Sequence, residues 1–393
     1  MKRVETLVVG AGVAGTTAAL HLARAGVGVL LVDRASFPRH KVCGCCLNDQ
    51  AVTALDEAGL AQQLEQAGAT PIDRIAVSCG RRRITLPSRG GVSLSRYKLD
   101  AMLMDAAKQA GCEVLTETSA RITHLPTDSQ DAVVVDVSSS TRRVPPQVRA
   151  RAVLVADGLA GSCTANIHRS QRITNPSSLR GYGTHLPAGS HQHPVGRVEM
   201  RCGSGGYVGT VVLEDGSLDI AAAMKPAWVK ACGGPASAAN QLAASAGEPL
   251  PDLNAYAWRA TAPLTGARER PWLPGVLFLG DAAGYIEPFT GEGMAWAMMS
   301  AQGVVPFVTQ AVAEGWRDPI GHAWQRAYDR SVRRRQARCK LFGAVLRRPR
   351  LLSAGLAASS LLPTNVQRLA ARAAMPPMFR PAHRHRAPEL AAT

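Results

Sequence analysis

The chain contains 393 residues, of which 46% are hydrophobic and 19% are charged. This composition is typical of a globular protein of two or three domains with a sizeable core. The longest apolar candidate, Leu351–Leu362, is too short to span a bilayer and carries three serines, so the sequence predicts no transmembrane helix.

The formal net charge of +16 is unevenly distributed. Residues 331–393 contain 13 Lys and Arg against one acid, Glu389, whereas the remaining residues are close to neutral. Such a segment favours an acidic carrier protein or an anionic membrane surface as a partner, and a solvated helical face is the simpler alternative. Nucleic acid is a weak alternative, because Arg333–Arg335 has no interleaved aromatic side chains for base stacking.

The nine cysteines are odd in number and irregularly spaced, which argues against a disulfide framework. We therefore expect a cytoplasmic location, with the inner membrane surface as a place of peripheral attachment. The basic start, Met1-Lys2-Arg3, is not interpreted as a secretory signal, because cleavage would remove the glycine motif described next.

The first 33 residues predict a βαβ unit. A strand over Val4–Val9 is followed by a Gly-x-Gly-x-x-Gly motif, a helix over Thr16–Ala25 and a second strand over Val29–Val32. Asp33 ends that second strand, about eighteen residues after the third glycine. Strand, spacing and acid together are typical of a dinucleotide-binding turn.

Each residue of this motif has a physical role. Gly10 permits the tight turn, Gly12 lets the backbone approach a pyrophosphate, and Gly15 lets the helix pack closely on the strand. The helix N-terminus offers free N–H groups to the phosphates, and Asp33 can accept hydrogen bonds from a ribose.

The next segment leaves this fold and returns to it. Residues 75–86 predict a hairpin, and Ser95 opens a helix that ends near Gly111. Strands are then expected over Ala132–Val137, Val144–Arg151 and Ala152–Ala156, the last leading into Asp157-Gly158.

Residues 171–268 predict a second sheet with a covering helix. The expected strands are Gly181–Leu186, Val195–Cys202, Tyr207–Leu213 and Leu218–Met224, and the expected helix is Ala236–Ala246. The last third of the chain predicts a short strand, Gly275–Leu279, and helices over Glu292–Glu314 and His322–Leu346.

A second glycine-rich motif, Gly280–Gly284, distinguishes a flavin from a nicotinamide site. An acid placed like Asp281, after a glycine that ends a strand, can take the ribityl hydroxyls of a flavin. The later Gly-rich turn, Gly291–Met294, opens a helix and can direct N–H groups at the N1–C2=O edge of the flavin, where reduction places negative charge.

Taken together, these motifs resemble the FAD-dependent oxidoreductases grouped around geranylgeranyl reductases and the group A flavin monooxygenases (aromatic hydroxylases), with the flavin halogenases as cousins. The resemblance covers about residues 1–320. It is carried by Gly10, Gly12, Gly15 and Asp33, by Ser36–Gly44, by Arg96 with Leu99 and Asp100, by Asp157, Gly158 and Ser162, and by Gly280–Met294.

The resemblance implies a set of FAD contacts. It also implies that Asp157-Gly158 contacts a pyridine nucleotide. The implied cofactor residues are Gly10, Gly12, Val13, Ala14, Gly15, Asp33, Arg34, Arg39, Lys41, Cys43, Arg96, Asp157, Gly158, Gly280, Asp281, Ala282, Pro288, Gly291, Glu292, Gly293 and Met294.

The chain also departs from its relatives. The Trp-x-Trp-x-Ile-Pro segment of the halogenases is missing, so halogenation is not expected. Of the Tyr-x-Trp-x-Phe-Pro stretch found in the reductases, only the tyrosine is kept, as Tyr207. We take Tyr207 as a candidate catalytic residue, and the loss of the rest of the stretch favours a monooxygenase over a prenyl reductase.

The segment Cys43-Gly44-Cys45-Cys46 has two interpretations. The resemblance places it beside the flavin, where Cys43 could be a redox-active or proton-donating thiol whose pKa Arg39 or Lys41 lowers. Alternatively, these are small residues packed under the cofactor. A metal site is not expected, because no second Cys/His pair lies at ligand spacing. The histidines 185, 191 and 193 are interpreted as ordinary polar residues of the second sheet.

The predicted fold is α/β, a Rossmann-like three-layer FAD-binding domain with an inserted, mixed and mostly antiparallel substrate sheet and a helical C-terminus. The predicted FAD-binding segments are 1–70, 96–170 and 269–320, the substrate segments are the hairpin 71–95 and the sheet 171–268, and a basic helical region, 321–378, precedes a disordered tail, 379–393.

The predicted function is that of an FAD-dependent oxidoreductase reduced by NAD(P)H. We expect a monooxygenase acting on a hydrophobic or carrier-bound substrate, such as a lipid, a polyketide or a quinone-like molecule. A flavin-dependent C=C reductase of the geranylgeranyl reductase type is the alternative, and a non-catalytic flavoprotein that binds an anionic partner is the weaker one. The sequence does not settle the oligomeric state.

Overall fold

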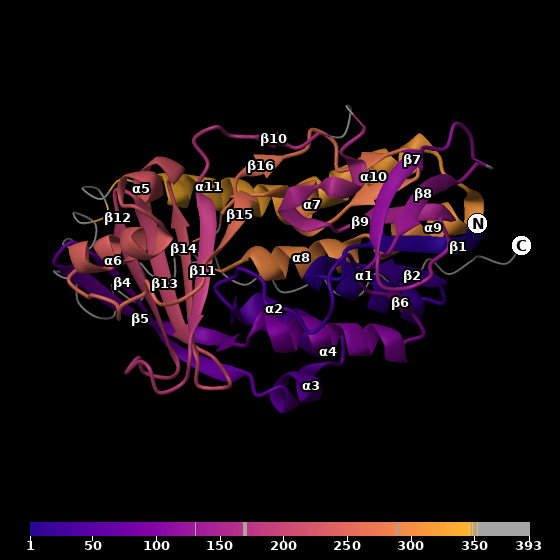
Figure 1. The fold of residues 1–393 in the computed structure, drawn as a ribbon. Helices are drawn as coiled ribbons and strands as arrows, with labels where there is room; N and C mark the ends of the chain where they lie inside the picture. Colours follow the sequence, from indigo (N-terminus) through magenta and orange to yellow (C-terminus); the bar gives the residue numbers. More distant parts are fainter. Residues whose placement is uncertain are drawn as a thin grey trace, which may run out of the picture.

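The computed structural model describes residues 1–129, 131–167, 171–287, 289, 291–346, 348 and 352. Two eight-stranded sheets form the two halves of the molecule, and helices α2 (Asp49–Glu57) and α8 (Gly293–Gly303) lie between them (Figure 1). The predicted α/β fold class is confirmed. The predicted tail and most of the basic region after residue 346 lie outside the described residues.

The first sheet is the nucleotide-binding type. Its central strand, β1 (Lys2–Val9), pairs in parallel with β2 (Val29–Val32) and β9 (Gln147–Val155). Leu7 and Val8 of β1 are fully buried, because helices cover both faces of a parallel sheet. The remaining strands are β6 (Glu113–Leu115), β7 (Ser119–His124), β8 (Val133–Ser138), β17 (Trp272–Leu273) and β18 (Val276–Phe278).

Helices from three distant parts of the chain surround this sheet. They are α1 (Val13–Arg24), α3 (Ala61–Gln66), α4 (Arg96–Gln109), α7 (Gly280–Ala283), α9 (Val305–Glu314), α10 (Asp318–Tyr328) and α11 (Arg334–Leu346). Among the described residues, no helix combines the length and apolarity needed to cross a bilayer.

The second sheet is mostly antiparallel, with one parallel pair, β4–β12. Its strands, in spatial order, are β15 (Arg259–Pro263), β11 (Arg180–Leu186), β14 (Leu218–Met224), β13 (Gly206–Val212), β12 (Arg197–Gly203), β4 (Thr70–Cys79), β5 (Arg82–Ser93) and β3 (Cys46–Leu47). A small third sheet contains β10 (Ile173–Thr174), β16 (Gly266–Ala267) and β19 (Gly284–Tyr285).

The two faces of the second sheet have different neighbours. One face carries Val208, Ile220 and Met224, which pack under α5 (Pro226–Ala231) and α6 (Pro235–Ser245). Because side chains alternate along a strand, the register places Tyr207 and Asp219 on the opposite face. That face meets the cofactor half of the molecule and therefore carries the candidate site.

Three element predictions need correction. The strands expected over Val144–Arg151 and Ala152–Ala156 are one continuous strand, β9. The helix expected over Glu292–Glu314 breaks at Val304, because Pro306 cannot donate the backbone hydrogen bond of a helix interior. The last expected helix begins at Asp318 rather than His322, and a π-helical turn interrupts it over Asp329–Arg333.

Part of the basic C-terminal region packs against the cofactor half of the molecule. The buried side chain of Gln336 donates to the Gly284 carbonyl, and Arg333 donates to the carbonyl of Arg268. Arg335 hydrogen-bonds the side chain of Gln50 on α2 at 2.6 Å. The first turns of α11 therefore belong to the folded body.

Candidate cofactor and active site

The first glycine motif forms a turn that tolerates no side chain at two positions. A Cβ on Gly15 would lie 1.8 Å from the Gly10 carbonyl oxygen. A Cβ on Gly10, whose φ is +103°, would lie 2.4 Å from the Ala156 carbonyl oxygen. Glycine at both positions lets α1 begin directly over the ends of β1 and β9, as the sequence predicts.

Gly12 faces a different environment, bounded by two cations. A Cβ there would have the guanidinium groups of Arg39 and Arg96 as its nearest neighbours, both at 3.7 Å. Within the described residues, the buried Nε of Arg39 has no hydrogen-bond partner. A backbone turn at a helix N-terminus with two guanidinium groups beside it fits the diphosphate of FAD.

Asp100 holds both of these cations in place. Its carboxylate accepts two hydrogen bonds from Arg96, at 2.8 and 2.9 Å, and lies 3.4 Å from Arg39. Burial alone would lower the pKa of Arg96, but Asp100 and Cys43 together outweigh burial and raise it. The sequence identified Asp100 as part of a motif and did not assign it a role at the site.

Asp33 organises the turn at the end of β2. Its carboxylate accepts hydrogen bonds from the backbone N–H groups of Ala11, at 2.7 Å, and Ala35, at 2.8 Å. Beside it lies a pocket of about 980 Å³, lined among others by Arg34, Arg39 and His40. Asp33 and Arg34 thus lie beside the position where the sequence predicts the ribose of a dinucleotide.

Lys41 lies where the predicted motifs meet. Its ammonium is close to Arg96 and to Asp281, and a Cβ on Gly158 would lie 3.9 Å from its Nζ. Burial lowers the pKa of Lys41, and the neighbouring Arg96 lowers it further. The structure therefore brings together residues from three separate segments of the sequence.

The second glycine-rich motif packs directly on the first. Gly280 has a φ of +52°, and a Cβ there would lie 2.9 Å from the Cβ of Ala14 on α1. Asp281 follows in the first turn of α7. Four predicted cofactor residues have side chains buried in the core, which leaves their backbone groups to face a cofactor: Val13, Ala14, Ala282 and Met294.

The loop before α8 lies against the cysteine segment. A Cβ on Gly291 would lie 3.6 Å from the Cys46 carbonyl oxygen, and Gly293 is the first residue of α8. The Glu292 carboxylate accepts a hydrogen bond from the Cys339 thiol at 2.6 Å, a contact between α8 and α11 that the sequence did not predict. Pro288 lies outside the described residues.

Asp157 holds the end of β9. Its Oδ2 accepts a hydrogen bond from the backbone N–H of Cys163 at 2.9 Å, and Arg268 lies nearby. Burial raises the pKa of the Asp157 carboxyl. Among the described residues its buried Oδ1 has no hydrogen-bond partner, so this oxygen can accept a bond from a bound ligand.

The cysteine segment contains thiols with opposite properties. The hydrogen bond from Cys45 and the nearby Arg96 together lower the pKa of Cys43 to about 6, against the effect of burial. The pKa of Cys45 is raised by its bond to Cys43 and by burial, and burial also raises that of Cys46. Cys43 is thus the thiol that ionises near neutral pH.

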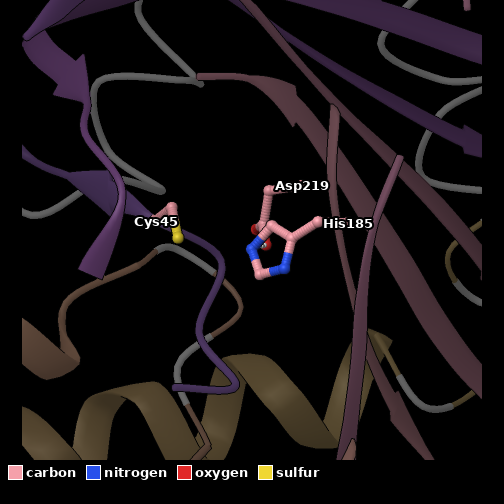
Figure 2. A group of neighbouring side chains, drawn as sticks. All are labelled: Cys45, His185 and Asp219. Atoms are coloured by element: carbon pink, nitrogen blue, oxygen red, sulfur yellow. Dashed lines mark ion pairs between the residues drawn. The ribbon is translucent and has the colours of Figure 1, made fainter. Parts of the chain in front are cut away.

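Cys45 also approaches two residues of the second sheet. Figure 2 shows it facing Asp219 and His185, and the ligand-type atoms of the three side chains all lie within 4.8 Å of one another. His185 Nε2 lies 2.9 Å from Asp219 Oδ1, and the Cys45 thiol hydrogen-bonds Asp219 as well. A metal was not expected here, and the three groups satisfy one another by hydrogen bonds.

Sequence reasoning missed the roles of His185 and Asp219. His185 was interpreted as an ordinary polar residue, and Asp219 was not considered. The two are direct partners across β11 and β14, on the face that Tyr207 also occupies. An acid and a histidine at matching inward positions of neighbouring strands are a usable signal once the register is known.

Tyr207 lies at the junction of the second sheet and the loop before α8. Its ring packs edge-on against Phe289, with centroids 5.1 Å apart, and its hydroxyl hydrogen-bonds Glu287. Burial and the Glu287 carboxylate raise its pKa, so the phenol stays protonated. Tyr285, which the sequence did not single out, lies near both Tyr207 and Cys43.

Comparison with known proteins agrees with this geometry. A family model described as an FAD binding domain matches residues 3–192. The menaquinone reductase of Mycolicibacterium smegmatis is 27% identical over 368 residues, which cover 85% of this chain and 84% of that protein. Digeranylgeranylglycerophospholipid reductase 2 of Methanothermobacter thermautotrophicus is 28% identical over 349 residues, covering 83% of this chain and 86% of that protein.

Solved structures share the fold. The myxobacterial chondrochloren halogenase CndH superimposes with a TM-score of 0.70 at 20% identity, covering 84% of this chain and 80% of that chain. PqsL of Pseudomonas aeruginosa gives a TM-score of 0.66 at 18% identity, covering 90% and 99%. These two structures show the fold alone. With the matched FAD binding domain and the sequence relatives, the motifs described above show that the chain is an FAD-dependent oxidoreductase, similar in sequence to reductases of the geranylgeranyl reductase type.

Proposed function

We propose that this protein is an FAD-dependent reductase that saturates a carbon–carbon double bond in a lipid or quinone-like substrate, with NAD(P)H as the electron donor. Two relatives that match most of its length are named as reductases, one of menaquinone and one of a digeranylgeranyl lipid. The likeness to halogenase and PqsL structures concerns the fold alone. This weighs against the monooxygenase that the missing sheet motif favoured.

The observation that carries the proposal is the Cys43 thiol. Saturating a double bond adds a hydride to one carbon and a proton to the other. Bound FAD would supply the hydride after reduction by NAD(P)H. Cys43 would supply the proton, since its pKa of about 6 lies near the operating pH, where a general acid works best.

The residues around the turn at Gly12 support one orientation of the cofactor. Arg39 and Arg96 would bind the diphosphate over the turn at Gly12, and Asp281 would bind the ribityl hydroxyls. The N-terminus of α8, which begins at Gly293, would face the end of the ring system that becomes negative on reduction. This orientation places the reactive part of the cofactor near the cysteine segment.

The neighbouring face of the second sheet suits an apolar substrate. Besides Tyr207 it presents Met200 and Val211, and it carries small residues where β11, β13 and β14 pair, at Gly183 and Ala221. Apolar and small side chains can lie along a hydrocarbon chain without leaving buried polar groups unpaired. The protonated Tyr207 would mark one end of this surface.

The proposal is tested by the product formed without oxygen. Purified protein is incubated anaerobically with FAD, NADPH and a prenylated quinone or geranylgeranyl lipid, and the products are weighed by mass spectrometry. A product heavier by two hydrogen atoms is expected. Products that gain an oxygen atom and appear only in air would show hydroxylation instead.

A matched pair of cysteine variants tests the assigned acid. Cys43→Ser should lower product formation by about 100-fold or more, the usual contribution of a general acid, while NADPH still reduces the bound FAD. Cys232→Ser, directly after the end of helix α5 on the other face of the second sheet, should behave as the parent protein. Full activity of Cys43→Ser would remove this thiol from the reaction.

A further inference from the structure

A row of titratable side chains connects Cys43 to the outside of the second sheet. The Cys45 thiol lies beside both Cys43 and Asp219 and can donate its single proton to either of them. Asp219, only 3% exposed, is paired across the strands with His185 at 2.9 Å. Figure 2 shows how Cys45, from the loop after residue 43, points into the space beside the two strand residues.

The outer end of this row reaches solvent. The His185 side chain is 30% exposed, and its ring lies 5.1 Å from the ring of the exposed His40. His40 in turn lines the pocket beside Asp33. Because the His185 side chain is itself partly exposed, it can take protons directly from water.

We propose that His185, Asp219 and Cys45 form a proton relay that reloads Cys43 after each turnover. The inference rests on the proposed function, in which Cys43 gives its proton to a substrate carbon. The reaction leaves a thiolate on Cys43, and the Cys45 thiol passes its proton to it. Cys45 then takes a proton from the Asp219 carboxyl, Asp219 takes one from the His185 imidazolium, and His185 takes one from water. Each bond to hydrogen that breaks is matched by one that forms.

The charges around the row favour proton uptake at its outer end. The hydrogen bond to Asp219 raises the pKa of His185, so it binds a proton from water more readily. Burial raises the pKa of Asp219, which makes a transiently protonated carboxyl accessible in spite of His185. The other charged and titratable groups that act on these residues are Arg96, Arg259, Asp215, His40, Cys46 and Tyr285.

The backbone at Cys45 supports a specific role for its thiol. Cys45 has a φ of +50°, in the left-handed region that favours glycine, and it is 1% exposed. A non-glycine residue is strained in this conformation, and such strain persists where the surroundings fix the residue. Glycine would be less strained at this position, so the presence of a cysteine supports a role for its thiol.

The first arm of the test uses turnover. His185→Ala should lower kcat about tenfold or more with little change in KM, because proton return and not substrate binding is impaired. Added imidazole should restore activity. His124→Ala is the control, since His124 forms a similar pair with Asp131, at 2.7 Å, on the distant β7–β8 hairpin. Equal kcat for the two variants would overturn the relay.

The second arm needs no turnover, so it separates failure of the relay from failure of the proposed reductase activity. The rate of Cys43 alkylation by iodoacetamide is followed against pH by peptide mass spectrometry. Cys45→Ala should shift the midpoint up from about 6, because a hydrogen bond to the thiolate is lost. Asp219→Asn should shift it down, because a nearby negative charge is removed.

Unchanged midpoints in both variants would overturn the relay, whether or not the protein reduces any substrate. Zinc that stays bound at one equivalent through desalting, and is lost in Cys45→Ala, would also overturn it. That result would make the three side chains metal ligands.

Discussion

At the scale of single residues, one buried carboxylate organises the cationic side of the cofactor site. Asp100 is fully buried and binds Arg96 and Arg39, the two guanidinium groups that face Gly12. A buried charge is costly unless it is paired, so removing the carboxylate leaves two cations without their anchor. The guanidinium groups would then lose the orientation that matches a diphosphate.

Asp100→Asn should therefore weaken FAD binding by about tenfold or more, the range expected when a buried ion pair loses one charge. Titration of flavin fluorescence measures the dissociation constant. Asp105→Asn is the control, because Asp105 lies on the same helix, exposed and paired with Lys108. An equal affinity of the two variants would contradict the role of Asp100.

The residues that the sequence could predict are those whose role is local. Gly10 and Gly15 follow from a turn whose geometry excludes a Cβ, and the structure gives them that geometry. His185 and Asp219 could not be identified in the same way, because their meeting with Cys45 depends on the register of β11 with β14 and on how a distant loop packs. Neither fact is encoded in local spacing.

At the scale of elements, one group of hydrogen bonds connects the two halves of the molecule. Ser95, the N-cap of α4, accepts a hydrogen bond from the Lys98 N–H. Its hydroxyl and its backbone N–H both donate to the Glu214 carboxylate, in the turn between β13 and β14. The helix N-terminus adds a favourable dipole for this negative charge. The same helix carries Arg96 and Asp100, so the contact positions the cationic side of the site.

Glu214→Gln should lower the free energy of unfolding by about 1–2 kcal/mol, the range for a charged hydrogen-bond acceptor at a helix N-terminus. Thermal unfolding followed by circular dichroism measures the change. Glu65→Gln, an exposed position on α3, should leave the melting temperature unchanged. If both variants have the same melting temperature, the contact between Ser95 and Glu214 does not stabilise the fold.

Elements with a strong apolar pattern were predicted well, and short or interrupted ones were not. The strands β11 and β14, which are buried along most of their length, lie where the sequence placed them. The short strand β6 was missed because three residues carry too little pattern. The break between α8 and α9 is caused by Pro306. The sequence prediction ran through it as one helix, because the apolar pattern continues across the proline.

At the scale of the whole molecule, the excess of positive charge divides into two parts. Within α11 and the turn before it, Arg333 and Arg335 hydrogen-bond to the folded body. Residues 347–393 contain eight further arginines and one acid. From the lipid substrate proposed above and the basic composition of this segment, we propose that the protein is recruited to an anionic membrane surface.

The full-length protein should therefore sediment with vesicles that contain anionic lipid and not with zwitterionic vesicles. Because electrostatic attraction is screened by salt, the bound fraction should fall several-fold between about 0.05 and 0.5 M salt. If the protein binds both vesicle types equally at both salt concentrations, the charged segment is not the cause of membrane binding.

The central claim, that Cys43 lies against the flavin and gains and loses its proton near neutral pH, is tested most directly by the visible spectrum of the FAD-loaded protein as a function of pH. A thiolate in contact with oxidised flavin gives a long-wavelength charge-transfer band. The band is expected to appear as the pH rises through about 6, the pKa of Cys43, and to be absent in Cys43→Ser. A spectrum that changes neither with pH in this range nor with the substitution would contradict the account.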